Sequence, residues 1–190
     1  MEKLASVLAE YMYRYNENPK FSYDIYRYCF LLFMEMSTGS VTGLLIAIYM
    51  SVQMEAVVFL AVFFLLRSYA GGFHCQTFLK CYLASTGILA GVFWLVKHWK
   101  AAPFISFILI LIFGGILAVL DGCESKNRPV DSEEAISFKK KLIRILAVTI
   151  ILFMVFIVLG YERCALSVSL AVTVSGLLMV IGKRKTNEKI

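Results

Sequence analysis

Long runs without charged side chains recur along this chain, and they limit its possible folds more than any other feature. Between Tyr28 and Met50 the one charged residue is Glu35. A helix rises about 1.5 Å per residue, so this run can cross the roughly 30 Å hydrocarbon core of a bilayer. Five more uncharged runs follow: Ala56–Leu66, Cys81–Val96, Ala101–Leu120, Ile145–Tyr161 and Cys164–Gly182. The sequence therefore predicts an all-α integral membrane protein with about six membrane segments.

The composition excludes a soluble enzyme. Hydrophobic residues make up 60% of the chain and charged residues 17%, whereas soluble domains average about 45–50% and 25%. The net charge of +6 would suggest nucleic acid as a partner of a soluble domain. Here the charges lie between apolar runs, so we expect them to set membrane topology, and we expect no nucleic-acid partner.

The distribution of Lys and Arg predicts the orientation in the cell membrane. If the N-terminus is cytoplasmic, 16 of the 19 Lys and Arg fall in cytoplasmic segments, as the positive-inside rule requires. Both termini are then cytoplasmic, and the stretch from Arg67 to Lys80 lies at the cytoplasmic face. The second apolar run is short, so the region near 51–73 either crosses the membrane or re-enters it.

The remaining segments fit one membrane-embedded domain over residues 1–190. Residues 1–19 place apolar side chains at helical spacing, which is typical of an amphipathic helix lying in the bilayer interface. The apolar side chains of this N-terminal helix are Leu4, Val7, Leu8, Tyr11, Met12 and Tyr15. The polar stretch 121–141 is expected to be a cytoplasmic loop.

Recognisable chemistry is concentrated between Arg67 and Cys81. His74 and Cys81 are seven residues apart, which in a straight helix separates them by about 10.5 Å, too far for a hydrogen bond. Gly71 and Gly72 supply the backbone freedom for a break. His74 could then fold back over the first turn of the helix that bears Cys81, where exposed N–H groups favour negative charge. Cys75, adjacent to His74, is the competing nucleophile and ranks lower because it points away from the imidazole on any helix.

Arg67, Gly71, Gly72, His74 and Cys81 together resemble the membrane cysteine endopeptidase family of accessory gene regulator protein B. The chain length, the hydropathy profile and the charged loop after the fourth span are also similar to that family. The resemblance implies quorum sensing in Gram-positive bacteria. Such an enzyme removes the C-terminal tail of an amphipathic propeptide, accessory gene regulator protein D, and promotes a cyclic thiolactone.

By this resemblance, His74 and Cys81 take the catalytic positions. Cys81 would attack the scissile carbonyl and His74 would accept and return the proton, which gives an acyl-enzyme thioester. No metal and no other cofactor is expected.

Other ionisable residues have proposed supporting roles. Glu35 lies inside an apolar span, where a charge is costly and is functional by default, and it could orient His74 or pair with Arg67. The alternative is that its side chain snorkels to the interface or is protonated. Arg67 could bind a substrate carboxylate or serve as an interfacial stop signal. An acidic propeptide tail could meet Arg67, Lys80, Lys139, Lys140 and Lys141.

Two alternatives and one packing question stay open. The chain could be a small transporter component, or a scaffold in which His74, Cys75 and Cys81 hold a soft metal ion, although three ligands make a poor structural zinc site. Gly39 and Gly43 form a Gly-x-x-x-Gly pattern, which permits close helix packing within the bundle or across a homodimer.

Overall fold

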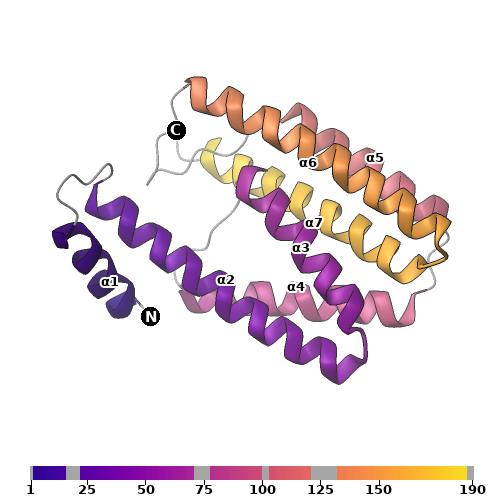
Figure 1. Ribbon diagram of the computed structural model, residues 1–190, viewed down its shortest axis with the longest axis horizontal. Coiled ribbons are helices and arrows are strands. Elements are labelled where there is room, and N and C mark those ends of the chain that lie inside the picture. Colours follow the sequence, from indigo (N-terminus) through magenta and orange to yellow (C-terminus); the bar gives the residue numbers. More distant parts are fainter. Residues whose placement is uncertain (1, 16–21, 71–77, 100–102, 121–131, 188–190) are drawn as a thin grey trace.

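The computed structural model describes residues 2–15, 22–70, 78–99, 103–120 and 132–187 (Figure 1). These residues form seven helices and no strand, which confirms the all-α prediction. The helices are α1 (Glu2–Tyr15), α2 (Tyr23–Met50), α3 (Gln53–Ala70), α4 (Phe78–His98), α5 (Pro103–Val119), α6 (Ser132–Val158) and α7 (Glu162–Asn187).

Five of the helices are long and apolar enough to cross a membrane, namely α2, α3, α4, α6 and α7. The remaining apolar helix, α5, has 17 residues, at the lower limit for a spanning helix. The region near 51–73 was expected either to cross the membrane or to re-enter it. Its described part contains one continuous helix, α3, which extends the short apolar run at both ends to 18 residues. The multi-pass membrane architecture expected from the sequence is therefore present.

Helix α7 lies at the centre of the bundle and packs against α3, α4, α5 and α6 (Figure 1). Its side chains are buried without interruption from Cys164 to Val172. Further along the helix, Gly176 lets α7 approach α5 closely, because an added Cβ there would lie 3.1 to 3.3 Å from atoms of Phe113. We refer to α3, α5, α6 and α7 as the core group.

Helices α2 and α4 lie side by side against this group, and we call them the flanking pair. They approach closely at Gly43, where an added Cβ would lie 2.9 Å from Leu89 Cδ1. The Gly-x-x-x-Gly pattern therefore serves packing within the bundle at this position. Phe93 of α4 meets Phe59 of α3 edge to face, with ring centroids 6.0 Å apart, and this contact joins the pair to the core group.

Two tight turns close one end of the bundle, which we call the turn end. In each turn one residue has a left-handed backbone conformation: Ser51 after α2 (φ 59°) and Gly160 after α6 (φ 76°). At each turn the next N–H bonds the carbonyl five residues back, Val52 to Ala47 (3.0 Å) and Tyr161 to Phe156 (2.9 Å). These are Schellman caps, which satisfy the last carbonyls of a helix.

Helix α1 packs on α2 and leaves its large apolar side chains exposed. Ala5 and Ala9 are fully buried, whereas Leu4, Val7 and Tyr11 are each more than half exposed. Arg27 Nε donates to Ser6 Oγ at 3.1 Å and holds the two helices together. An interfacial helix remains the prediction for this segment, and the structure adds that its small residues and the Tyr13 ring contact α2.

Helix α6 begins earlier than the sequence predicted. The expected loop 121–141 continues as helix from Ser132, so Lys139, Lys140 and Lys141 lie in its first turns. The loop was predicted because this stretch is rich in charged residues. Lys and Glu are nevertheless good helix formers, so α6 begins well before the apolar run.

Candidate functional site

Apart from the lysines proposed for the substrate tail, three of the predicted site residues lie in described helices, at the end of the bundle opposite the turn end. Glu35 is in α2, Arg67 is in the last turn of α3 and Cys81 is in the first turn of α4. All three side chains are partly buried. His74, Gly71 and Gly72, together with Cys75, lie outside the described residues, so the contact between His74 and Cys81 stays a prediction.

Cys81 faces the interior of the bundle. It lies about three turns before Val92 on the same face of α4, and Val92 is 5% exposed. Cys81 is also the fourth residue of α4, within the turn whose backbone N–H groups have no partner in the helix. The thiol is thus directed away from lipid and located where the helix dipole favours an anion.

Glu35 faces α4. It precedes Thr42 by about two turns on the same face of α2. The Thr42 hydroxyl forms a hydrogen bond of 2.9 Å with the Tyr82 hydroxyl of α4. Because α2 and α4 run in the same direction (Figure 1), Glu35 is directed toward the beginning of α4, the helix that carries Cys81.

Arg67 lies on the bundle side of α3. Leu60 and Ala56, about two and three turns earlier on the same face, are 7% and 0% exposed. A guanidinium in this position can reach into the bundle end while its stem packs on apolar neighbours. The structure therefore directs Glu35, Arg67 and Cys81 inward from three different helices.

The basic side chains proposed for the substrate tail separate into two kinds. Lys139 Nζ donates to the last carbonyl of α5, Val119, at 3.4 Å. Lys141 Nζ lies 5.8 Å from the centroid of the Tyr69 ring, which also contacts Phe138. Lys80 and Lys140 are exposed. Lys139 and Lys141 thus hold α6 to its neighbours, and Lys80 and Lys140 present their charge at the surface.

Thr42 and Tyr82 were not predicted as site residues. Only their spacing could have pointed to them: Thr42 follows Glu35 by two helical turns, and Tyr82 adjoins Cys81. Neither position is distinctive without knowing that α2 and α4 pack together.

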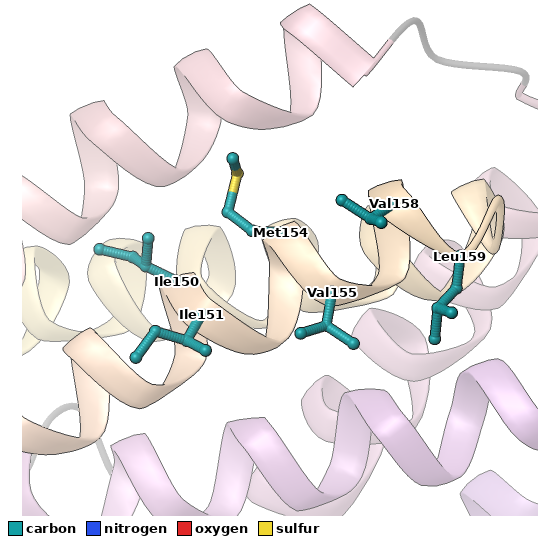
Figure 2. A pocket seen from close by; sticks show the side chains of 6 residues that line it. All are labelled: Ile150, Ile151, Met154, Val155, Val158 and Leu159. Carbon is teal, nitrogen blue, oxygen red and sulfur yellow. The ribbon is translucent and has the colours of Figure 1, made fainter.

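Two surface hollows formed by described residues lie away from these side chains and are apolar. A hollow of about 360 Å³ on α6 is entirely aliphatic apart from one thioether (Figure 2). A second of about 270 Å³ lies between α5 and α6 and is also apolar. The first is lined by Ile150, Ile151, Met154, Val155, Val158 and Leu159. Within the described part of the chain, no group of three or more His, Cys, Asp or Glu could hold a metal ion.

Comparison with known proteins identifies the family. No curated protein and no solved structure gives a significant match. The family model of accessory gene regulator B matches residues 2–181, which include all seven helices except the last residues of α7. The match spans α1, the core group and the flanking pair. This chain is therefore a member of the accessory gene regulator B family, whose role is the processing of quorum-sensing propeptides.

Proposed function

We propose that this chain is a cysteine endopeptidase of the cell membrane that cuts the C-terminal tail from an amphipathic signal propeptide and promotes its cyclisation. The observation that supports this most directly is Cys81. The family match covers it, and it is a partly buried cysteine in the first turn of α4, on the face that points into the bundle. With His74 as base, it has the elements of a thiol nucleophile.

The first half of the reaction forms an acyl-enzyme. His74 takes the proton of the Cys81 thiol, and the thiolate attacks the scissile carbonyl carbon. The C–N bond then breaks, and His74 returns the proton to the leaving amine. The products are the released tail and a thioester between Cys81 and the new C-terminus.

The second half exchanges one thioester for another. An internal cysteine thiol of the propeptide attacks the acyl carbon, Cys81 leaves as thiolate, and the incoming thiol's proton passes to it through His74. The exchange has little net energetic cost because the bond type is unchanged. Water must be excluded for cyclisation to outcompete hydrolysis, and a thiol that faces the interior of a membrane bundle favours that exclusion.

The charged residues around the site suit a tail with acidic side chains. Lys80, next to Cys81, and Lys140 are exposed, so their charges are available to a peptide at the surface. Arg67 faces the same bundle end from α3, where its planar donors suit a carboxylate. Glu35 is assigned the role of orienting His74, as the third member of a triad does.

Capture of the acyl-enzyme tests the proposal. A propeptide whose internal cysteine is replaced by serine can form the thioester but not the thiolactone. Incubated with this chain in lipid vesicles, it should leave an adduct on Cys81 that hydroxylamine releases and that peptide mapping locates. His74→Ala should form no adduct.

The matched control is Cys75→Ala, which should form the adduct normally. An adduct on Cys75, or cleavage of the propeptide without any thioester, would contradict the proposed mechanism.

A further inference from the structure

Thr42 and Tyr82 form a polar contact between two membrane-spanning helices. Their hydroxyl oxygens are 2.9 Å apart, and both side chains are partly buried. Other hydroxyls of α2 bond to their own helix instead, as Thr38 does to the Met34 carbonyl at 2.7 Å. A Thr hydroxyl in an apolar span can satisfy itself within its helix in this way, so the Thr42 hydroxyl does not need Tyr82 as a partner.

The Tyr82 side chain is held from two directions. Phe78, one turn earlier in α4, stacks on its ring with centroids 6.2 Å apart and planes 5° apart. The hydroxyl is held by Thr42 of α2. Because its ring and its hydroxyl are both held, Tyr82 fixes the position of the beginning of α4 along the axis of α2.

This contact sets the positions of two proposed site residues. Cys81 is the immediate neighbour of Tyr82, and Glu35 shares the face of α2 that carries Thr42. One residue beyond Thr42, Gly43 makes room for Leu89 of α4. The packing at Gly43 brings α2 and α4 close, and the hydroxyl pair then fixes their rotation and register.

We infer that Tyr82, through its hydrogen bond to Thr42, is a positioning residue that holds Cys81 at a fixed height and angle relative to Glu35. The inference rests on the proposed function, because it assigns the register of α2 and α4 a purpose in peptide cleavage. Misplacing a reacting atom by about 1 Å can lower a rate 10²-fold. Losing one of several contacts between these helices should produce a smaller shift and a smaller loss.

The test compares variants that each remove one hydroxyl without changing side-chain shape. Tyr82→Phe and Thr42→Val should each lower kcat for propeptide cleavage about tenfold with KM unchanged, and Thr42→Ser should retain most of the rate. The double variant should be no slower than either single variant, because both remove the same contact. Thr38→Val is the matched control and should stay within twofold of the parent.

The double variant separates positioning from stability. Removing both partners of a hydrogen bond is nearly neutral for stability, so a purely structural role predicts that the double variant recovers the parent kcat. Recovery, or a loss in Thr38→Val equal to that in Tyr82→Phe, overturns the inference.

A second readout does not depend on cleavage. In a chain whose other cysteines are replaced by alanine, the rate at which iodoacetamide alkylates Cys81 should change severalfold in Tyr82→Phe and Thr42→Val, but not in Thr38→Val. Equal rates in all variants contradict the positioning role. If Cys81→Ala still cleaves propeptide, the proposed function fails. If Cys81→Ala is inactive while Tyr82→Phe has full activity, only the positioning role fails.

Discussion

The Thr42 hydroxyl of the flanking pair and three hydroxyls of α7 in the core group bond to different kinds of partner. In α7 the hydroxyls of Ser169, Thr173 and Ser175 bond to carbonyls of their own helix, and the helix is buried through small side chains. In the flanking pair the Thr42 hydroxyl reaches across to Tyr82. A hydroxyl inside a membrane bundle thus indicates how two helices are positioned when it bonds to the neighbouring helix rather than to its own.

The cysteines show the same contrast. Cys164 is 6% exposed at the beginning of α7, among the packed side chains of the core group. Cys81 is partly buried at the beginning of α4, on the face that also meets the core. Packing accounts for the first thiol, and the proposed chemistry requires the second.

Replacing these two cysteines should give the largest difference between the regions. Cys81→Ala should lower propeptide cleavage by at least about 10³-fold, as expected for loss of a nucleophile. Cys164→Ala should retain cleavage and change only stability. Tail release in lipid vesicles, at matched expression, measures both. Equal propeptide cleavage by Cys81→Ala and Cys164→Ala would contradict the different roles assigned to the two cysteines.

Two glycine replacements, one in the core group and one in the flanking pair, should differ in their cost because their surroundings differ. Gly176→Ala should destabilise the bundle by about 1–3 kcal/mol, the usual cost of overpacking, because the new Cβ meets both side chain and backbone of Phe113. Gly39→Ala should be nearly neutral, since nothing lies within 4 Å of its added Cβ. Unfolding in mixed micelles gives both free energies, and a larger cost at Gly39 would reverse the comparison.

The two Schellman caps offer a reciprocal test at the turn end. Ser51→Gly should stabilise the chain by about 1 kcal/mol, because only glycine adopts the left-handed region without steric cost. Gly160→Ser should destabilise it by a similar amount. The same unfolding assay applies, and changes of the same sign at both turns would be inconsistent with this account.

Exposed lysines should give the smallest effect. Lys80→Glu and Lys140→Glu should each raise KM about threefold at low ionic strength, because exposed charge pairs are weak and screened by salt. Lys97→Glu, in the same helix as Lys80 but at the turn end, should leave KM unchanged. An effect that persists at high salt would point away from a charge contact with the tail. A larger effect for Lys80 than for Lys140 would place the tail nearer the flanking pair.

Membrane segments were predictable from this sequence because the bilayer imposes length and polarity on each helix. The run from Tyr28 to Met50, in which Glu35 is the one charged residue, lies within α2 and ends with it. One boundary failed because charge was taken as the end of a helix: α6 starts at Ser132, inside the expected loop 121–141. Long cationic side chains reach the interface from within a helix, so a charge does not mark where the backbone changes.

The candidate site was predictable only where its residues are adjacent in sequence. The placement of Cys81 in the first turn of a helix is confirmed. The Thr42–Tyr82 contact depends on which helices pack together, and no residue pattern in the chain specified that α2 meets α4. The contact of Lys141 with Tyr69 was missed for the same reason, since it joins α6 to α3.

The central place of α7 has a consequence for biosynthesis. Helices α3, α4, α5 and α6 all leave the ribosome before the helix that they surround. At about 5–20 residues per second, the 26 residues of α7 take roughly 1–5 s to emerge. During that interval the earlier helices sit in the bilayer without their common partner, so assembly of the bundle waits for the last described helix to insert among them.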